Sequence, residues 1–384
     1  MAFPDVVIIG AGVVGAACAF YAARAGLSVT VVDRGAVAAG ATATGQGLVH
    51  AATRAPGPAL ELALESLRRW EELGADLGAA RLELTRKGSL AVAATPADRA
   101  ALADLAARQR TAGLAAVDVG GDDLRDYEPL LAPGLAGGVH YPHELQVDAV
   151  VAAAHLLRAS GADVRFGVDV RAMELDAGMR VAGVRTARRE RIACGAVVNA
   201  AGVGGGDVAA LAGTGLPIIP GRGFLLVTEP FGAPRPGRRH PPPIRHAVYA
   251  AASQAPARRP EGAASVTGTR AGALLIGASR ERAGLDRSWP LPVLRALAAR
   301  AVALFPFLAG VSVIGVVRGF RPDTPDQLPI IGPDPWVRGL YHACGHAGAG
   351  VTLAPATGAL VADMLTESPA AVAAAFPFHP ERFG

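Results

Sequence analysis

Residues 5–33 of the chain read DVVIIGAGVVGAACAFYAARAGLSVTVVD. The apolar run over residues 5–9 predicts a buried parallel strand, because strands covered on both faces read as continuous hydrophobic runs. A GxGxxG pattern over residues 10–15 opens an Ala-rich stretch that predicts a helix to residue 24, and a second strand is predicted over residues 28–32. Strand, glycine turn, helix and strand in this order predict a βαβ unit that binds a dinucleotide.

Each residue of this motif has its own physical task. Gly10 allows a tight turn, Gly12 lets a pyrophosphate approach the backbone, and Gly15 lets the helix pack against the strand. The N-terminus of the helix attracts phosphates through its N–H groups and its dipole. Asp33 stands where a carboxylate accepts a hydrogen bond from a ribose hydroxyl. The negative charge of Asp33 also disfavours a dinucleotide with a 2′-phosphate. Arg34 would offset this repulsion if its side chain faced the ribose and not solvent.

Residues 196–206, AVVNAAGVGGG, predict another strand that enters a glycine-rich turn. This segment lacks the GxGxxG spacing and has no acidic residue about 20 positions further on. The chain therefore has one dinucleotide fingerprint, which excludes a flavoprotein reductase with two complete ones. A nicotinamide-dependent dehydrogenase stays open on these grounds.

The composition excludes several classes of protein. Of 384 residues, 51% are hydrophobic and 18% are charged, which excludes a disordered chain. The net charge is +4, but the basic residues are scattered, so we expect no nucleic-acid partner. Lys87 is the single lysine. The 3 cysteines form no CxxC pair, which predicts the reducing cytoplasm and no metal site. The uncharged run over residues 6–23 is short for a membrane span and holds the motif glycines, so we expect no transmembrane segment or signal peptide.

The rest of the chain predicts a mixture of helices and strands. Leu60, Ala63, Leu64 and Leu67 repeat at helical spacing and predict an amphipathic helix near residues 58–78. The other predictions are strand alternation over 79–95, a helix after Pro96, a helix from about Asp148, short strands over 164–194, strands and loops over 217–317, and an exposed loop from Arg235 to His240.

Motifs along almost the whole chain resemble those of the FAD-dependent glycine oxidase, sarcosine oxidase and D-amino acid oxidase family. GFRP over residues 319–322, LPIIG over 328–332 and GVTLAPATG over 350–358 are the most specific, because they occur in the family's order and spacing. The resemblance also rests on the unit over 10–33, the loop over 40–47, a helix over about 58–77, QVD at 146–148, VVNAAG at 197–202, and Gly345-His346.

The resemblance implies an α/β (α+β) fold. A Rossmann-like FAD-binding domain would be interleaved with a substrate domain whose sheet is mostly antiparallel. Carried over to this chain, the FAD-binding domain takes residues 1–84, 147–212 and 318–384. The substrate domain takes residues 85–146 and 213–317.

FAD is the cofactor that the resemblance implies. We expect it to be noncovalent, because relatives of the sarcosine oxidase type carry an attaching Cys where the stretch from Val316 to Pro325 has none. Those relatives also place a Lys beside the flavin to activate oxygen, whereas Lys87 lies outside that motif. The residues expected to bind FAD are Gly10, Gly12, Val13, Val14, Gly15, Asp33, Arg34, Thr42, Gly45, Gln46, Gly47, Val170, Ala200, Gly202, Arg321, His346, Gly348, Gly350, Val351 and Thr352.

Three side chains are candidates for the chemistry. By the resemblance, Arg321 pairs with a substrate carboxylate or forms a structural ion pair beneath the flavin, and Arg318 is an alternative for the first role. Tyr249 is the second candidate, although the family's active-site Tyr corresponds in position to Ser265. His50 is the third, since it follows a loop that lies near the flavin in the family.

Two further residues carry weaker expectations. His346 lies in a turn before a helix, where backbone N–H groups would stabilise negative charge on a reduced flavin. Arg222 follows a Pro-Gly turn and is expected either to line the entrance or to face solvent.

The sequence thus predicts an FAD-dependent oxidoreductase that oxidises the C–N bond of an amino acid or secondary amine by hydride transfer to flavin N5, after which water hydrolyses the imine. One alternative is the flavin subunit of a multi-subunit dehydrogenase for amino acids, opines or hydroxyproline, which passes electrons to a partner. Others are a flavin-binding subunit without catalysis and an NAD-dependent dehydrogenase. The expected partners are a small amine or amino acid, and either a dehydrogenase subunit or a second copy of the chain.

Overall fold

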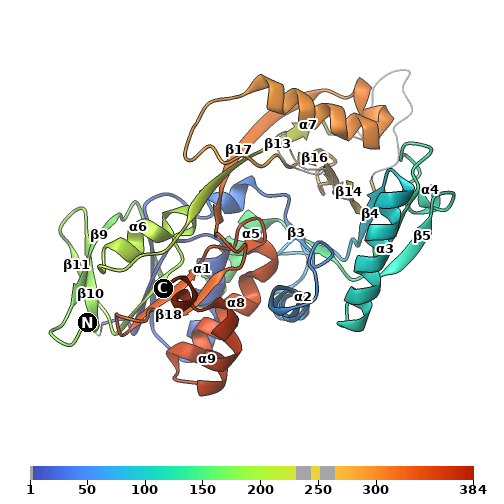
Figure 1. Cartoon of the computed structure of the whole chain (residues 1–384). Helices are drawn as coiled ribbons and strands as arrows, with labels where there is room; N and C mark the ends of the chain where they lie inside the picture. Colours follow the sequence, from blue (N-terminus) through green and yellow to red (C-terminus); the bar gives the residue numbers. More distant parts are fainter. Residues whose placement is uncertain (1–2, 231–243, 251–263) are drawn as a thin grey trace.

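The computed structural model describes residues 3–230, 244–250 and 264–384 (Figure 1). A sheet in its lower half contains the predicted βαβ unit. Strand β1 (Val6–Ile9) lies between β12 (Ala196–Asn199) and β2 (Val29–Asp33) with parallel pairing on both edges, while β18 (Ile330–Pro333) adds an antiparallel edge. In spatial order the sheet consists of β18 (Ile330–Pro333), β19 (Leu340–Cys344), β12 (Ala196–Asn199), β1 (Val6–Ile9), β2 (Val29–Asp33) and β8 (Asp163–Phe166).

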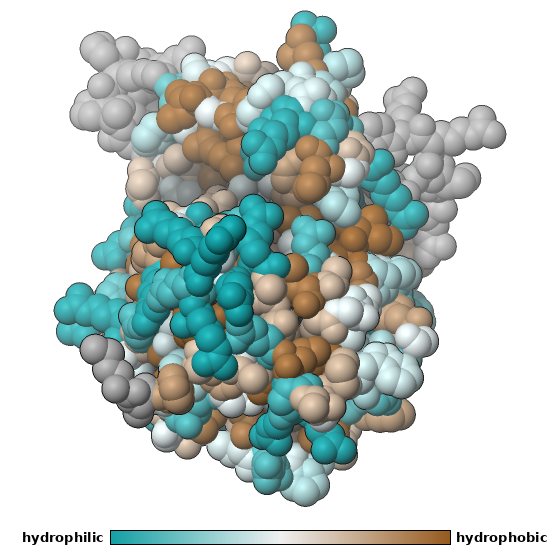
Figure 2. Space-filling model, turned by 90° about the vertical axis from the view of Figure 1, so that its left-hand side faces the viewer, coloured by the Kyte–Doolittle hydropathy of each residue, from teal (hydrophilic) through white to brown (hydrophobic). Residues whose placement is uncertain are grey.

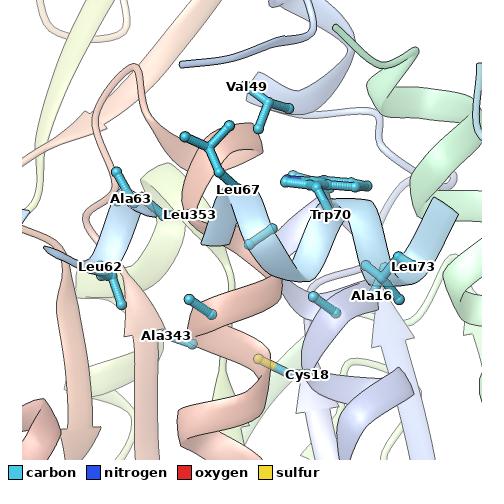
Figure 3. Close-up of a cluster of buried hydrophobic side chains, with 14 of the residues drawn as sticks. Ala16, Cys18, Val49, Leu62, Ala63, Leu67, Trp70, Leu73, Ala343 and Leu353 are labelled. Carbon is cyan, nitrogen blue, oxygen red and sulfur yellow. The ribbon is translucent and has the colours of Figure 1, made fainter. Parts of the chain in front are cut away.

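Long helices cover this sheet. They are α1 (Val13–Arg24), α2 (Pro58–Leu77), α5 (Ala149–Ser160) and α8 (Gly350–Leu365). Helices α1 and α8 pack so closely that a Cβ on Gly358 would stand 2.6 Å from the backbone carbon of Ala17. Figure 3 shows Leu67 and Trp70 of α2 beside Leu353 of α8. The indole of Trp70 donates a hydrogen bond to the carbonyl of Val351 at 2.9 Å, so α8 is held from both sides.

A second sheet forms the upper half of the molecule. Its strands are antiparallel except where β14 (Ala247–Ala250) and β4 (Ser89–Ala93) pair in parallel. In order, the described strands are β17 (Val313–Asp323), β13 (Ile219–Thr228), β16 (Leu274–Gly277), β15 (Ser265–Gly268), β14 (Ala247–Ala250), β4 (Ser89–Ala93), β6 (Gly137–Tyr141) and β5 (Val117–Gly120).

The two faces of this second sheet contact different parts of the molecule. Because side chains alternate along a strand, one set of positions points up towards α7 (Leu291–Leu304) and the other points down. The upper set includes Leu90, Val248 and Val266, which share an apolar cluster with Leu297 of α7. The lower set faces the first sheet and builds the site described below.

The remaining elements are small. A three-stranded sheet of β9 (Val170–Leu175), β10 (Val181–Thr186) and β11 (Arg191–Ala193) lies at the left of Figure 1 and faces the viewer in Figure 2. Hydrophilic side chains gather in the middle of that face. Within the three-stranded sheet, Glu174 pairs with Arg185 and Arg191. The others are β3 (Leu48–Val49), β7 (Leu145–Gln146), α3 (Pro96–Thr111), α4 (Leu124–Tyr127), α6 (Gly205–Ala210) and α9 (Pro369–Ala375).

The α/β fold class is confirmed, as are the helices expected near 58–78, after Pro96 and from Asp148. The strand expected within 79–95 is confirmed as β4, but it is limited to Ser89–Ala93 and is buried on both faces, so its burial does not alternate. Another prediction was wrong. The stretch over 217–317 contains the helix α7, whose first turn holds Pro292, a residue tolerated there because its missing N–H has no helical partner. The loop expected from Arg235 to His240 lies outside the described residues. The domain boundaries stay a proposal, and β17 runs across the one set between residues 317 and 318.

Residues 347–365 are long and apolar enough to cross a membrane by length and composition, and most of this segment is buried inside the protein. The packing of α8 against α1 and α2 accounts for that apolarity.

Candidate active site

A cavity of about 1170 Å³ lies between the two sheets. Its lower wall is the carboxyl edge of the βαβ unit, where Gly10 follows β1 and Asp33 ends β2. Its upper wall is the lower face of the second sheet, which contributes Leu225, Ser265 and Tyr249. Ligands of parallel α/β sheets bind at this kind of edge.

The lower wall is built from backbone. Gly10 has φ +118°, and a Cβ there would stand 2.4 Å from the carbonyl oxygen of Ala200. A Cβ on Gly15 would stand 1.9 Å from the carbonyl oxygen of Gly10, so the helix touches the turn directly. Gly12, Val13 and Val14 form the start of α1 on the cavity wall. The cavity therefore meets the positive end of a helix dipole with no side chain in between at Gly12.

Asp33 lines the same end of the cavity. Its Oδ2 accepts the N–H of Ala11 at 2.8 Å and its Oδ1 accepts the N–H of Gly35 at 2.7 Å. Each carboxylate oxygen keeps a further lone pair. Asp33 is thus held in place and can still accept a hydroxyl hydrogen bond. Arg34 also lines the cavity.

The turn before α8 closes the side of the cavity. His346 is buried, and its Nε2 lies 3.0 Å from the hydroxyl of Thr357. Burial lowers the pKa of His346 to about 3, so its imidazole is neutral. Ala347, at φ 49°, donates its N–H to the carbonyl of Pro322 at 2.9 Å. Gly348, Gly350 and Val351 follow along the wall.

Arg321 reaches the cavity from β17. Its Nη1 donates to the carbonyl of Ser279 at 3.0 Å, and a Cβ on Gly223 would stand 2.1 Å from the same nitrogen. Burial, and then the charge of Arg280, lower the pKa of Arg321, but a guanidinium stays charged under such conditions. Arg280 itself is paired with Asp323 at 3.0 Å. Within the described part of the chain Arg321 forms no ion pair.

Tyr249 and Ser265 are direct cross-strand neighbours, because β14 and β15 pair in the register Tyr249–Ser265. Both line the cavity. Ser265 donates its hydroxyl hydrogen to Oε1 of Gln46 at 2.7 Å. Burial raises the pKa of Tyr249 well above its usual value, so the phenol keeps its proton.

His50 lines the cavity near Tyr249, with 6.4 Å between the ring centroids. The backbone N–H of His50 donates to the hydroxyl of Thr352 at 3.2 Å, and the backbone carbonyl of His50 accepts a hydrogen bond from the side chain of Arg54. Burial, and then the charge of Arg54, lower the pKa of His50 to about 3. Its Nδ1 is buried and has no hydrogen-bond partner among the described residues.

Comparison with known proteins decides the family. The model of the DAO family, described as FAD dependent oxidoreductase, matches residues 5–364. The chain belongs to this family. It is 31% identical to glycine oxidase of Pseudomonas putida over 391 residues, with 98% of each chain covered. It is 27% identical to the hydrogen cyanide synthase subunit HcnC of Pseudomonas aeruginosa, with 94% of this chain and 92% of that protein covered. The crystal structure of glycine oxidase from Geobacillus kaustophilus superposes with a TM-score of 0.85 at 28% identity and 98% coverage of both chains.

The cofactor of this DAO family member is FAD, and the expectation of an FAD-dependent oxidoreductase is confirmed. The cavity fits the group. It is long enough to run from Asp33 to Tyr249, and its wall is bare backbone at Gly10 and Gly12, where a pyrophosphate needs close approach. All but two of the residues expected to bind FAD line it.

Gly15 and Thr352 are the two exceptions. Gly15 lies behind the wall, where its missing side chain permits the contact with Gly10. Thr352 joins the backbone of His50 to that of Leu48 and supports the wall from behind. Neither is therefore a contact residue of the cavity.

The structure also separates the arginines named as alternatives. Arg318 points to the opposite side of β17 from Arg321 and packs over the ring of Trp289, 4.6 Å from its centroid. The expectation that Arg222 lines the entrance or faces solvent was wrong, since it is only 5% exposed. It is paired with Glu281 at 3.1 Å and with Asp286, away from the cavity.

Sequence reasoning missed a buried polar cluster above His50. Glu144, Ser89 and Arg54 gather there around Tyr249. The sequence holds one weak signal for it, since Glu144 stands just before the family-like QVD at 146–148. No periodicity of the chain distinguishes this Glu from an exposed one.

Proposed function

We propose that this protein oxidises the C–N bond of an amino acid or secondary amine whose carboxylate binds Arg321. Arg321 supports the proposal most directly, because it is a charged group on the cavity wall with no carboxylate paired to it among the described residues. A guanidinium holds a carboxylate through two parallel hydrogen bonds. The relatives named glycine oxidase point to the same substrate class.

Bound FAD would supply the chemistry of the reaction, accepting a hydride from the substrate Cα, so that the amine becomes an imine that water hydrolyses. The protein's part is to hold the reactants. Arg321 fixes the carboxylate, and Tyr249 and His50 border the space beside it. Because both of these side chains are neutral, neither of them repels the substrate amine. We further propose that the pyrophosphate lies on the turn over residues 10–14 and that Asp33 accepts a ribose hydroxyl.

We propose noncovalent FAD and a cytoplasmic protein. Cys344 is the cysteine on the cavity wall among the described residues, and burial raises its pKa to about 12. A protonated thiol is a poor nucleophile, which argues against attachment. The three cysteines are buried and free, as expected in a reducing compartment.

Arg321→Ala tests the substrate assignment, with Arg318→Ala as its matched control on the same strand. Anaerobic flavin bleaching identifies the substrate from a panel of glycine, sarcosine, D-amino acids, cyclic imino acids and opines. For that substrate, Arg321→Ala should raise KM about 10- to 150-fold, because a charge-assisted hydrogen bond contributes about 1.5–3 kcal/mol. Arg318→Ala should leave KM unchanged. Equal KM values in Arg321→Ala and in the unmodified enzyme would remove Arg321 from the site.

A second candidate is the flavin subunit of a multi-subunit dehydrogenase. The match to a hydrogen cyanide synthase subunit favours it. Hydrogen peroxide formation by the purified chain with its substrate supports an oxidase. Bleaching without peroxide supports a subunit that passes electrons to a partner. A yellow protein that no amine bleaches supports a flavin subunit without catalysis, and a colourless one supports nicotinamide chemistry.

A further inference from the structure

Glu144 is a buried carboxylate at the upper end of the cavity wall. It lies between β6 and β7 and is only 2% exposed. Its Oε1 accepts the backbone N–H groups of Ala51 and Ala52, both at 2.7 Å. Its Oε2 accepts the hydroxyl hydrogen of Ser89. Because the two backbone groups can only donate, the orientation of the carboxylate is fixed.

The hydroxyl groups next to Glu144 have a defined direction. Ser89 has one hydroxyl hydrogen and gives it to Glu144, so its oxygen can only accept from other groups. The hydroxyl oxygens of Ser89 and Tyr249 are 3.4 Å apart, and Tyr249 is therefore the donor of that pair. The phenol also has a single hydroxyl hydrogen, which is used in the bond to Ser89. The Tyr249 oxygen therefore has only lone pairs facing the cavity.

We propose that Glu144, acting through Ser89, makes the Tyr249 hydroxyl an acceptor that binds the N–H of the substrate amine. Glu144 and Ser89 are positioning residues, since neither lines the cavity. The inference rests on the proposed function and adds to it how the amine end of the substrate is held.

The charged and titratable groups around Glu144 agree with this arrangement. Burial raises the pKa of Glu144 to about 7, and the hydrogen bonds from Ser89, Ala52 and Ala51 and the charge of Arg54 favour the ionised form that is present above that pH. Tyr141 and Tyr249 face the carboxylate as neutral phenols. His50, beside Tyr249, is neutral. A neutral amine carries N–H donors and finds Tyr249 as an acceptor, while Arg321 takes the carboxylate.

Glu144→Gln reverses the direction of the hydroxyl groups. The amide oxygen must face the N–H groups of Ala51 and Ala52, so the amide NH₂ faces Ser89 and donates to it. Ser89 then donates to Tyr249, whose hydrogen turns into the cavity against the amine. We expect KM for the amine substrate to rise by more than about 13-fold, because the loss of one neutral hydrogen bond in Tyr249→Phe represents about 2- to 13-fold.

The double variant Glu144→Gln/Ser89→Ala discriminates between this mechanism and general damage. Ser89→Ala alone lets the phenol rotate and should raise KM only about twofold. Without the hydroxyl that transmits the reversal, the double variant should return to the KM of Ser89→Ala. A merely structural role predicts the opposite, namely a double variant at least as poor as Glu144→Gln.

Two controls complete the experiment. Acetate, which has the carboxylate but no amine, should perturb the flavin absorbance with the same Kd in Glu144→Gln, Ser89→Ala, the double variant and the unmodified enzyme, because all four retain Arg321. Glu128→Gln removes another buried carboxylate, one that accepts from His246, and should leave the amine KM unchanged. If the double variant is no better than Glu144→Gln, or if acetate weakens in parallel with the amine, the positioning role is wrong although the proposed function stands. If no amine bleaches the unmodified enzyme, the proposed function fails and this inference fails with it.

Discussion

The cavity has two ends made of different material. Around Gly10 and Gly12 the wall is backbone, set by a turn and a helix start that are contiguous in the chain. Around Tyr249 it is side chains, brought by strands from separate parts of the chain and held by hydrogen bonds between Ser265 and Gln46 and between Ser89 and Glu144. A backbone wall can present N–H groups to any phosphate, whereas a wall of side chains can be changed residue by residue. The same cavity therefore combines a fixed cofactor end with an adjustable substrate end.

The backbone end should tolerate no added side chain, and this is the largest effect we expect. Gly15→Ala places a Cβ 1.9 Å from the carbonyl oxygen of Gly10, so the helix must move off the turn. We expect the free energy of unfolding to fall by about 3 kcal/mol or more. We also expect the protein to lose its bound FAD. FAD content and thermal midpoint measure it. Gly26→Ala, at φ +88° with nothing within 4 Å, is the matched control and should lose only about 1–2 kcal/mol with FAD retained.

Two neutral histidines line the cavity, His346 in its side wall and His50 near Tyr249, and this predicts acid sensitivity. Their folded pKa values of about 3 lie below the ordinary 6.5, so their contribution to stability is complete above pH 6.5 and is lost as the pH falls towards 3. At pH 4.5 the protonation of each histidine should have lowered the free energy of unfolding by about 3 kcal/mol. Glu144 acts in the opposite sense, because its raised pKa of about 7 stabilises the fold as the pH falls from 7 to 4.5.

Urea unfolding of the holoenzyme between pH 7.5 and 4.5 measures the balance. We expect a net loss of stability on acidification, and Glu144→Gln should steepen it because the opposing contribution disappears. A stability that rises towards pH 4.5 would contradict the neutral state of the two histidines.

The side-chain end should respond to pH during turnover. Burial raises the pKa of Glu144 to about 7, and a proton on Oε2 would reverse the hydrogen bond to Ser89. Below pH 7, where Glu144 is protonated, the hydroxyl hydrogen of Tyr249 points at the substrate amine. Above pH 7 the lone pairs of the Tyr249 oxygen face the amine. Substrate amines titrate as well, so the informative quantity is the ratio of kcat/KM in the unmodified enzyme to that in Ser89→Ala. This ratio should rise about tenfold from pH 5.5 to 8.5, and a flat ratio would separate Glu144 from substrate binding.

The sequence was sufficient where neighbouring residues make the structure. Gly10 to Asp33 form a complete unit whose strands, turn and helix follow from local pattern, and GFRP located Arg321 through resemblance. The register that sets Tyr249 opposite Ser265 depends on strand pairing between distant segments, and no local pattern contains it. Glu144 looks like any surface carboxylate in the sequence, since its burial depends on the backbone of Ala51 and Ala52. The helix α7 was missed because the prolines at its start read as loop.

The contact between Gly358 and Ala17 has a consequence for biosynthesis. Helix α1 is synthesised long before its partner α8, because most of the described helices and strands lie between them in the chain. The central strand β1 likewise waits for residues 196–199 on one edge. A nascent chain therefore carries the apolar helix α1 without α8 until residues 350–365 have been made, and the turn before α8 joins the cavity wall only then. Until that point the face of α1 that will contact α8 lacks this partner, and transiently exposed apolar surface of this kind promotes aggregation, which chaperones counter.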